Sequence, residues 1–246
     1  MISIFEKKIF LVDYLEGFVD IHNHILPGID DGAKNVEESL SLLRAFGEFG
    51  VKNFICTPHI MSNYYDNTPT TIKSSYKELK KGMDENDMND LNLGYAAEHM
   101  IDANFDTLLE KEEFMPLKKD FLLIEMSYLQ PSINFEKAVG DILDRQFFPV
   151  FAHPERYVYL HEDFKKYSAY KQMGLKFQLN ALSLFGYYGK GIQKIAYKML
   201  KESMFDYIAT DTHSHRHIEA LKAGKLKRND LFLITQLINN TIEQFR

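Results

Sequence analysis

The chain has 246 residues, of which 45% are hydrophobic and 26% are charged, and its formal net charge is −6. These proportions are close to those of average folded globular proteins, so they exclude the disordered and fibrous classes. The negative charge argues against nucleic acid as the main partner, because binding to a phosphate backbone needs a basic surface. The single cysteine, Cys56, permits no internal disulfide bond, which agrees with a reducing compartment.

The N-terminal segment lacks the features of a targeting sequence. Only the four apolar residues 9–12 stand between Lys8 and Asp13, which is too short for the core of a signal peptide. No run in the sequence approaches the ~18 apolar residues that a membrane span needs. We therefore expect a cytoplasmic protein. Residues 1–17 are expected to form an N-terminal extension, a short helix or edge segment packed on a single domain of residues 18–246.

Short apolar segments alternate with helical patterns along the chain. Seven segments read as buried strands: residues 18–24, 53–57, 93–98, 121–125, 149–153, 176–180 and 207–211. Helices are predicted between them over residues 36–49, 70–85, 103–111, 133–145, 163–173 and 191–202, with one or two more closing the chain. Asn35 is the expected N-cap of the first helix, and Gly50 ends it.

This alternation predicts an α/β fold with a parallel sheet and right-handed crossovers, and seven such units favour a closed barrel over an open sheet. No internal repeat or low-complexity linker divides the chain, so we expect a single domain. Six side chains stand at, or just after, the ends of different predicted strands: His22, His59, Glu98, Glu125, His153 and Asp211. In (β/α) barrels these ends form one mouth where catalytic groups gather, so the six are expected to converge.

The first predicted strand ends in two histidines, His22 and His24, one residue apart. Because residues i and i+2 of a strand point to the same face, both rings can bind one metal ion. The Gly/Pro turn that follows carries Asp30 and Asp31, which bring oxygen ligands beside the nitrogen ligands. Taken alone, the His-x-His pattern is equally compatible with two hydrogen-bonded strand histidines.

Five imidazoles and four carboxylates are candidate metal ligands: His22, His24, Asp31, His59, Glu98, Glu125, His153, Asp211 and His213. This set is large enough for three ions. Mixed nitrogen and oxygen ligands suit Mn, Fe or Zn, and the absence of thiolates argues against a structural zinc cluster. A multinuclear site of this kind activates water and holds the oxygens of a transferring phosphoryl group, which is a hydrolase arrangement.

Several motifs together resemble the PHP (polymerase and histidinol phosphatase) superfamily: Asp20-Ile21-His22-Asn23-His24, Asp30-Asp31-Gly32, Thr57-Pro58-His59, Ile124-Glu125, Ala152-His153-Pro154-Glu155-Arg156-Tyr157 and Asp211-Thr212-His213. Within it they look most like the bacterial metal-dependent tyrosine-protein phosphatases of capsular and exopolysaccharide gene clusters. The resemblance extends from about Phe18 to at least His213. It implies a distorted (β/α)7 TIM-like barrel, in agreement with the seven predicted strands.

The resemblance also implies three divalent metal ions, with Mn expected first and Fe or Zn as alternatives. It assigns the first ion to His22, His24, Glu98 and Asp211. Glu98 would bridge to a second ion held by Glu125 and His153, and the third would lie among Asp31, His59 and His213. His99 directly follows Glu98 and competes with it for the role of ligand.

Two arginines accompany the candidate ligands. Arg156 resembles the phosphate-binding arginine of the family, and a guanidinium fork matches phosphate oxygens bidentately. The alternative is a surface arginine paired with Glu155 or another acid. Arg216 stands at a slightly different offset from the arginine that the family often has, so its role is open. His215 and His217 are either exposed or in contact with substrate.

The resemblance implies a protein-tyrosine phosphatase acting on a phosphotyrosine-bearing kinase of polysaccharide export, with a metal-bridged hydroxide attacking phosphorus. Two alternatives stay open: a small-molecule phosphatase of the histidinol-phosphate type, and a metal-binding regulatory domain without catalysis. A cysteine-dependent mechanism is not expected, because such enzymes have an arginine six residues after the nucleophile and Ser62 occupies that position relative to Cys56.

Overall fold

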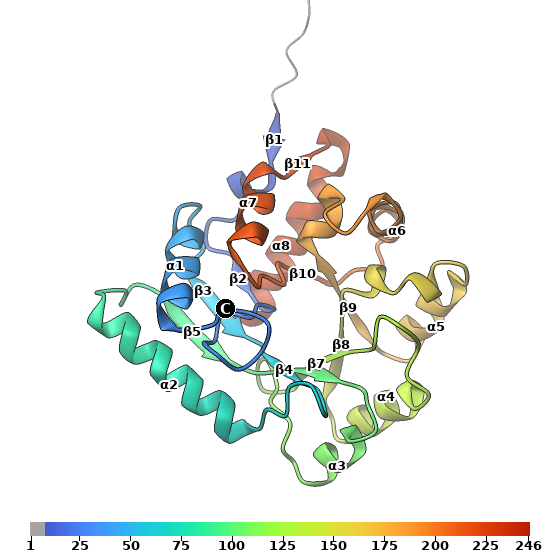
Figure 1. Ribbon diagram of the computed structural model, residues 1–246. Coiled ribbons are helices and arrows are strands. Elements are labelled where there is room, and N and C mark those ends of the chain that lie inside the picture. Colours follow the sequence, from blue (N-terminus) through green and yellow to red (C-terminus); the bar gives the residue numbers. More distant parts are fainter. Residues whose placement is uncertain (1–7) are drawn as a thin grey trace, which may run out of the picture.

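The predicted barrel is present in the computed structural model of the chain, which describes residues 8–246 (Figure 1). Its strands form two parallel ladders. The first has the order β2 (Val19–Asp20), β3 (Asn53–Cys56) and β5 (Asn92–Tyr95). The second has the order β4 (His59–Ile60), β6 (Glu98–Met100), β7 (Phe121–Glu125), β8 (Phe148–Ala152), β9 (Lys176–Asn180) and β10 (Tyr207–Ala209).

The second and third strands of the barrel are each divided into two pieces. β3 and β4 are separated at Pro58, which has no N–H group with which to continue a ladder. β5 and β6 are separated where the Ala97 N–H donates to the carbonyl of Met115, in the segment before β7. The prediction of one strand over residues 93–98 was therefore wrong in extent, since Glu98 begins β6 instead of ending a strand.

The barrel closes between its first and last strands. The His24 N–H donates to the carbonyl of Thr212 at 2.9 Å, and the Asp211 N–H donates to the carbonyl of His22 at 2.7 Å. These hydrogen bonds continue the parallel pairing past the ends of β2 and β10. Closure therefore brings the His-x-His segment next to Asp211, although almost the whole chain separates them in sequence.

Helices surround the barrel (Figure 1). They are α1 (Val36–Gly47), α2 (Pro69–Glu85), α3 (Phe105–Glu110), α4 (Phe135–Asp144), α5 (Lys165–Gln172), α6 (Lys190–Lys201), α7 (His215–Ala223) and α8 (Leu231–Phe245). Short 3-10 helices cover Leu11–Tyr14, Pro154–Arg156, Val158–Leu160, Ala181–Phe185 and Arg228–Asp230. The side chain of Asn35 accepts a hydrogen bond from the Glu38 N–H and caps α1, as the sequence predicts.

The described part of the N-terminal extension packs on the barrel. β1 (Ile9–Phe10) pairs antiparallel with β11 (Lys225–Leu226), and a 3-10 helix follows it. Leu11 and Leu15 are buried. The extension thus combines the edge segment and the short helix that the sequence leaves as alternatives, while residues 1–7 lie outside the described part of the chain.

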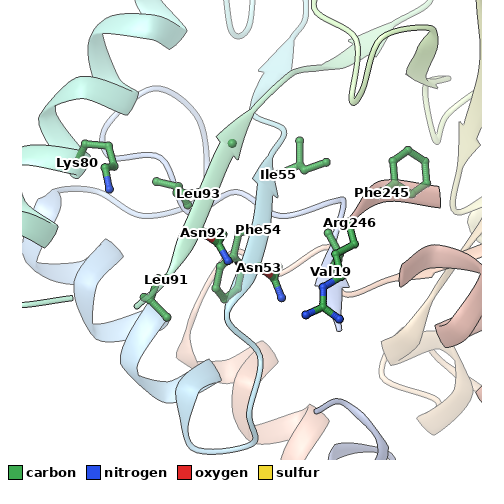
Figure 2. A pocket seen from close by; sticks show the side chains of 11 residues that line it. Val19, Asn53, Phe54, Ile55, Lys80, Leu91, Asn92, Leu93, Phe245 and Arg246 are labelled. Atoms are coloured by element: carbon green, nitrogen blue, oxygen red, sulfur yellow. Dashed lines mark hydrogen bonds between the residues drawn. The ribbon is translucent and has the colours of Figure 1, made fainter. Parts of the chain in front are cut away.

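The N-terminal end of the barrel is closed by the last turn of α8. Phe245 packs its ring against Phe121 and Tyr207, with ring centroids 5.4 and 5.0 Å apart. Figure 2 shows a pocket of about 490 Å³ at this end, lined by residues such as Asn53, Leu93 and Phe245. All of its lining residues are described, and none is a candidate metal ligand. The chemistry predicted from sequence therefore belongs to the opposite end.

None of the helices within residues 8–246 is both long enough and apolar enough to cross a bilayer.

Candidate metal centre

The structure brings together all nine residues that the sequence nominates as ligands. Their donor atoms fall into four overlapping groups, and within each group every atom lies within 4.8 Å of the others. The groups are His24, Asp31, His59 and His213; His22, His24 and Asp211; His22, Glu98 and His153; and His59, Glu98 and Glu125. The side chains come from all around the barrel and meet at one mouth, as expected for the C-terminal ends of parallel strands.

Glu98 lies at the middle of this cluster and is fully buried. Its Oε2 atom is 3.2 Å from His22 Nε2 and 3.1 Å from His59 Nδ1, while its Oε1 atom is 3.1 Å from His153 Nε2. One carboxylate thus faces imidazoles from three different strands. This is the position that a bridging ligand needs.

Within residues 8–246, three buried atoms of the cluster have no hydrogen-bond partner: His59 Nδ1, Glu98 Oε2 and Glu125 Oε1. They are nevertheless close, since His59 Nδ1 lies 3.1 Å from the Glu98 oxygen and 2.9 Å from the Glu125 oxygen. Buried polar atoms without a partner are rare and cost about 1–3 kcal/mol each. A cation between the three atoms would satisfy them all, and this nitrogen and oxygen donor set fits a divalent transition metal.

Hydrogen bonds to the far sides of the rings orient the first two histidines. His24 Nδ1 donates to Asp30 Oδ2 at 2.7 Å, and His22 Nδ1 donates to Gln178 Oε1 at 2.8 Å. Both Nε2 atoms then lie 3.4 Å from Asp211 Oδ1. Burial opposes a charge on His24, but the carboxylates of Asp30 and Asp211 together outweigh burial and raise the pKa of His24 to about 10. Such outer partners fix the ring orientation of metal-binding histidines.

His99, the competitor of Glu98, has both ring nitrogens committed elsewhere. Its Nδ1 donates to the carbonyl of Leu123 at 2.9 Å, and its Nε2 accepts from the Met115 N–H at 3.1 Å. Burial lowers the pKa of His99 to about 4, so the ring is neutral. His99 therefore holds the chain segments beside β6 together, and Glu98 alone of the two faces the cluster.

Two candidate ligands have left-handed backbone conformations, with φ of 34° at His153 and 51° at Asp211. Residues with side chains rarely adopt this conformation, which costs of order 1–3 kcal/mol and persists where the surrounding structure enforces it. Both residues follow barrel strands, β8 and β10. Such strain is concentrated at functional sites, in agreement with the role predicted for these two side chains.

Arg156 lies at the edge of the cluster. Its Nη1 donates to Asp211 Oδ2 at 2.6 Å, and its guanidinium lies between two rings, 4.6 Å from the centroid of Tyr128 and 4.0 Å from that of Tyr188. Its side chain is only 17% exposed, so it is not a surface arginine, and its partner is Asp211 and not Glu155. The sequence did not indicate this contact with a candidate ligand.

The second arginine lies farther from the cluster. Arg216 is exposed on the first turn of α7, and its neighbour His215 hydrogen-bonds Ser41 on α1. Within residues 8–246, no hydrogen bond or ion pair joins Arg216 to a candidate ligand. His217 is half-buried, and its Nδ1 lies 3.1 Å from the carbonyl oxygen of Asp211. A role for Arg216 in binding phosphate thus stays a prediction without a supporting contact.

A cleft of about 780 Å³ opens beside the cluster. Asp31, His59 and Glu125 line its inner end, and the ring of Tyr65, which also lines it, stacks on the ring of His59 with centroids 5.3 Å apart. The hydroxyl of Tyr128 lies 3.1 Å from His153 Nε2. A substrate in this cleft would thus have the candidate ligands at one end and aromatic side chains along its walls.

The family described as "Capsular polysaccharide synthesis, CpsB/CapC" matches residues 18–226. The chain belongs to this family. Tyrosine-protein phosphatase YwqE of Bacillus subtilis (strain 168) is 27% identical over 197 residues, which cover 80% of this chain and 77% of that protein. Tyrosine-protein phosphatase CpsB of Streptococcus pneumoniae is 28% identical over 231 residues, which cover 87% and 95% respectively.

A solved structure also matches this chain in fold. It comes from work on YwqE of Bacillus subtilis and CpsB of Streptococcus pneumoniae, described there as unique metal-dependent tyrosine phosphatases. It superimposes with a TM-score of 0.76 at 25% identity and covers 90% of this chain and 94% of that chain. These matches confirm the resemblance to capsule-cluster tyrosine phosphatases and the distorted TIM-like barrel, and they are consistent with the PHP superfamily.

The CpsB/CapC match includes all nine candidate ligands and Arg156, since these lie between residues 18 and 226. The sequence indicates Asp30, beside Asp31, as a source of oxygen ligands, whereas the structure has Asp30 hydrogen-bonded to His24 Nδ1, where it orients that ring. Sequence reasoning missed other supporting side chains, among them Gln178 and Tyr128. No local pattern marks these two, because their role depends on contacts between distant strands and loops.

Proposed function

We propose that this CpsB/CapC chain is a metal-dependent protein-tyrosine phosphatase, that residues 18–246 form its catalytic domain, and that its substrate is a phosphotyrosine-bearing kinase of capsule or exopolysaccharide export. One observation carries the proposal: three buried donor atoms of His59, Glu98 and Glu125 face one another without hydrogen bonds at the inner end of an apolar cleft. The relatives named as tyrosine phosphatases support it.

We further propose three divalent ions, with Mn first and Fe or Zn as alternatives. One group of donor atoms supports a shared ion for His22, His24 and Asp211. Glu98 belongs to two groups, which supports its role as a bridge between two ions. The groups differ from the pairing implied by resemblance, because His24 also groups with Asp31, His59 and His213, and His153 groups with His22 and Glu98 instead of Glu125. In addition, His59 Nδ1 faces Glu98 and Glu125 while His59 Nε2 is 3.5 Å from Asp31. His59 is therefore proposed to serve two ions through its two ring nitrogens.

The candidate ligands and Arg156 have different roles in the proposed hydrolysis. Divalent ions held by the candidate ligands would supply a nucleophile at neutral pH, because metal coordination can lower the pKa of water from 15.7 to about 7. Arg156 uses one N–H to hold Asp211 and directs its remaining donors to the phosphoryl oxygens. The rings of Tyr128 and Tyr188 restrict its motion, so the guanidinium is positioned before substrate binds.

The shape of the cleft favours a polypeptide over a small metabolite. Large apolar side chains on its lining are exposed, with exposed fractions of 79% for Tyr64, 92% for Leu129 and 99% for Ile133. A pocket for histidinol phosphate would enclose its ligand, since small-molecule sites bury most of the ligand surface. An open cleft instead leaves room for the chain on either side of a tyrosine.

The test is hydrolysis of p-nitrophenyl phosphate, a phosphotyrosyl peptide and histidinol phosphate with Mn²⁺. We expect hydrolysis of the first two, its loss on chelation and its return when Mn²⁺ is added back. Full activity after exhaustive chelation, with metal content verified as nil, would contradict the proposal. Preference for histidinol phosphate would favour the small-molecule alternative, and metal binding without any turnover would favour the regulatory domain.

A further inference from the structure

We infer that the cleft beside the metal centre is a groove for the apolar, uncharged residues that flank phosphotyrosine in a polypeptide substrate. We call it the apolar groove; its walls are residues 61–62, 64–65, 100–103 and 127–134. The inference rests on the proposed function and goes beyond it, because it states which sequences around the phosphotyrosine the enzyme prefers.

The apolar groove is continuous with the metal centre. Asp31, His59 and Glu125 form its inner end, and Tyr65 stacks on His59. A phosphoryl group held at the centre therefore places the rest of its polypeptide along the groove. The groove volume of about 780 Å³ exceeds the space that one tyrosyl ring fills, so neighbouring residues have room beside it.

The walls of the groove are fixed to one another by hydrogen bonds. The Ser62 N–H donates to Asp102 Oδ2 at 2.8 Å, which joins the first wall to the second. The Ser132 hydroxyl donates to the carbonyl of Ile101 at 2.6 Å, which joins the third wall to the second. The groove is therefore formed before substrate binds, and little conformational entropy is lost on binding.

Apolar side chains at the outer end of the groove are left in solvent. Leu129 is 92% exposed and Ile133 is 99% exposed, and both line the groove. Single exposed apolar residues are ordinary, but a cluster of them around a cleft marks a binding site. Covering these side chains with apolar residues of a substrate would remove apolar surface from water, which favours binding.

The charges of the groove select against acidic flanking residues. Among the described residues that line the groove, the acidic side chains are Asp31, Asp102 and Glu125, and none is a lysine or an arginine. Asp31 and Glu125 belong to the metal centre, while Asp102 accepts backbone N–H groups from Ser62 and Asn104. An acidic residue in the groove would lose water without gaining a cation, so uncharged flanking residues are favoured.

The experiment compares two phosphotyrosyl peptides of equal length with Mn²⁺ present, one flanked by Leu and Val and one flanked by Glu. We expect kcat/KM to be roughly tenfold or more higher for the apolar peptide, and the Leu129→Ser/Ile133→Ser double variant to lower it roughly five- to thirtyfold through KM. Hydrolysis of p-nitrophenyl phosphate, which has no flanking residues, should be unchanged. Phe232→Ser is the matched control, because Phe232 is 75% exposed on α8 and does not line the groove.

Several results would overturn the inference. They are a preference for the Glu-flanked peptide, an unchanged KM in the double variant, or an equal loss with p-nitrophenyl phosphate. A wild-type dimer in sedimentation that the double variant abolishes would make the groove a self-association surface instead. If wild type hydrolyses no phosphoester, the proposed function fails. The affinities of non-hydrolysable phosphonate versions of the two peptides then decide whether the groove still binds apolar sequences.

Discussion

Arg156 donates a hydrogen bond to the carboxylate of Asp211, which is also a candidate metal ligand, so removing Arg156 changes the surroundings of that carboxylate too. Asp211 Oδ2 also accepts a hydrogen bond from Asn180 Nδ2 at 2.8 Å, so the carboxylate keeps a partner when the guanidinium is removed. Charge-assisted hydrogen bonds contribute roughly 1.5–3 kcal/mol each, so Arg156→Ala should lower kcat/KM by about ten- to several-hundredfold. Arg156→Lys should restore part of the activity, because it keeps the charge and loses the fork.

Metal stoichiometry is the control for Arg156→Ala, and we expect it to be unchanged. A variant that loses metal along with activity would make Arg156 a residue that orients Asp211, and phosphate binding would then fall to Arg216 or to another group. Activity and metal content measured on the same samples separate the two roles.

Glu98 should be among the residues least tolerant of change, because it faces His22, His59 and His153 at once. Glu98→Gln keeps the shape of the side chain but removes the charge that two ions would share. We expect loss of bound metal and of hydrolysis, measured by elemental analysis and by turnover of p-nitrophenyl phosphate. Metal content and rate equal to wild type would move the bridge to another carboxylate.

Cys56 should be dispensable for catalysis. It is buried in β3, and burial raises the pKa of its thiol well above the usual value, so no thiolate nucleophile is available. Cys56→Ser should therefore retain hydrolysis while losing some stability, because a hydroxyl replaces a small apolar group. Loss of activity with metal content and folding intact would refute a metal-based mechanism.

The clustering of the candidate metal ligands was predictable, and the residues that orient them were not. The candidate ligands occur in short motifs near strand ends, which the sequence displays directly. Gln178 instead reaches His22 across 156 positions of sequence, and an amide in a strand gives no sign of such a contact. Whether Glu98 or His99 faces the cluster likewise depends on Met115, because the Met115 N–H donates to the His99 ring. No local sequence pattern predicts where Met115 lies.

At the scale of elements, the turn after β2 depends on Gly32. A Cβ atom at this position would lie 1.9 Å from the carbonyl oxygen of His24 and 2.6 Å from its Cβ, so even a methyl group must displace that histidine. Gly32→Ala should therefore lower metal content and activity. Gly140→Ala is the matched control, since nothing lies within 4 Å of its Cβ in α4, and it should raise stability by up to ~1 kcal/mol.

Thermal unfolding and metal analysis of the two glycine variants check this prediction. A Gly32→Ala protein with full metal content and activity would show that the turn can move away from His24 without cost to the centre. A loss of activity in Gly140→Ala would instead show that helix substitutions act on the centre indirectly.

The sequence pattern predicts the order of the strands and helices, but it does not predict where two of the barrel strands are interrupted. Every surrounding helix, and every barrel strand except β4, overlaps a segment that the sequence predicts, because apolar segments and helical periodicity alternate regularly. Pro58 explains the division between β3 and β4 by its missing N–H. No residue in the sequence predicts the division between β5 and β6. It occurs where the Ala97 N–H donates to the carbonyl of Met115, which lies in a connecting segment without a periodic pattern.

At the scale of the whole molecule, the barrel concentrates negative charge at one end. Four carboxylates of the centre, Asp31, Glu98, Glu125 and Asp211, come from different parts of the chain, and three of them are buried. Burial, and next the charge of Glu98, raise the pKa of Glu125. Folding therefore brings like charges together at a site where divalent cations would neutralise them.

Because only the folded chain forms this centre, metal should stabilise the whole molecule. A ligand at one hundred times its dissociation constant contributes about 2.7 kcal/mol to the free energy of unfolding. For a chain of this size, about 1 kcal/mol shifts Tm by roughly 2–4 °C, so saturating Mn²⁺ should raise Tm by about 5–10 °C. Differential scanning calorimetry of chelated protein with increasing Mn²⁺ measures the shift. Glu98→Gln should reduce it, and an unchanged Tm in wild type despite stoichiometric binding would show that the unfolded chain binds Mn²⁺ as tightly as the folded chain, against the expectation that only folding forms the centre.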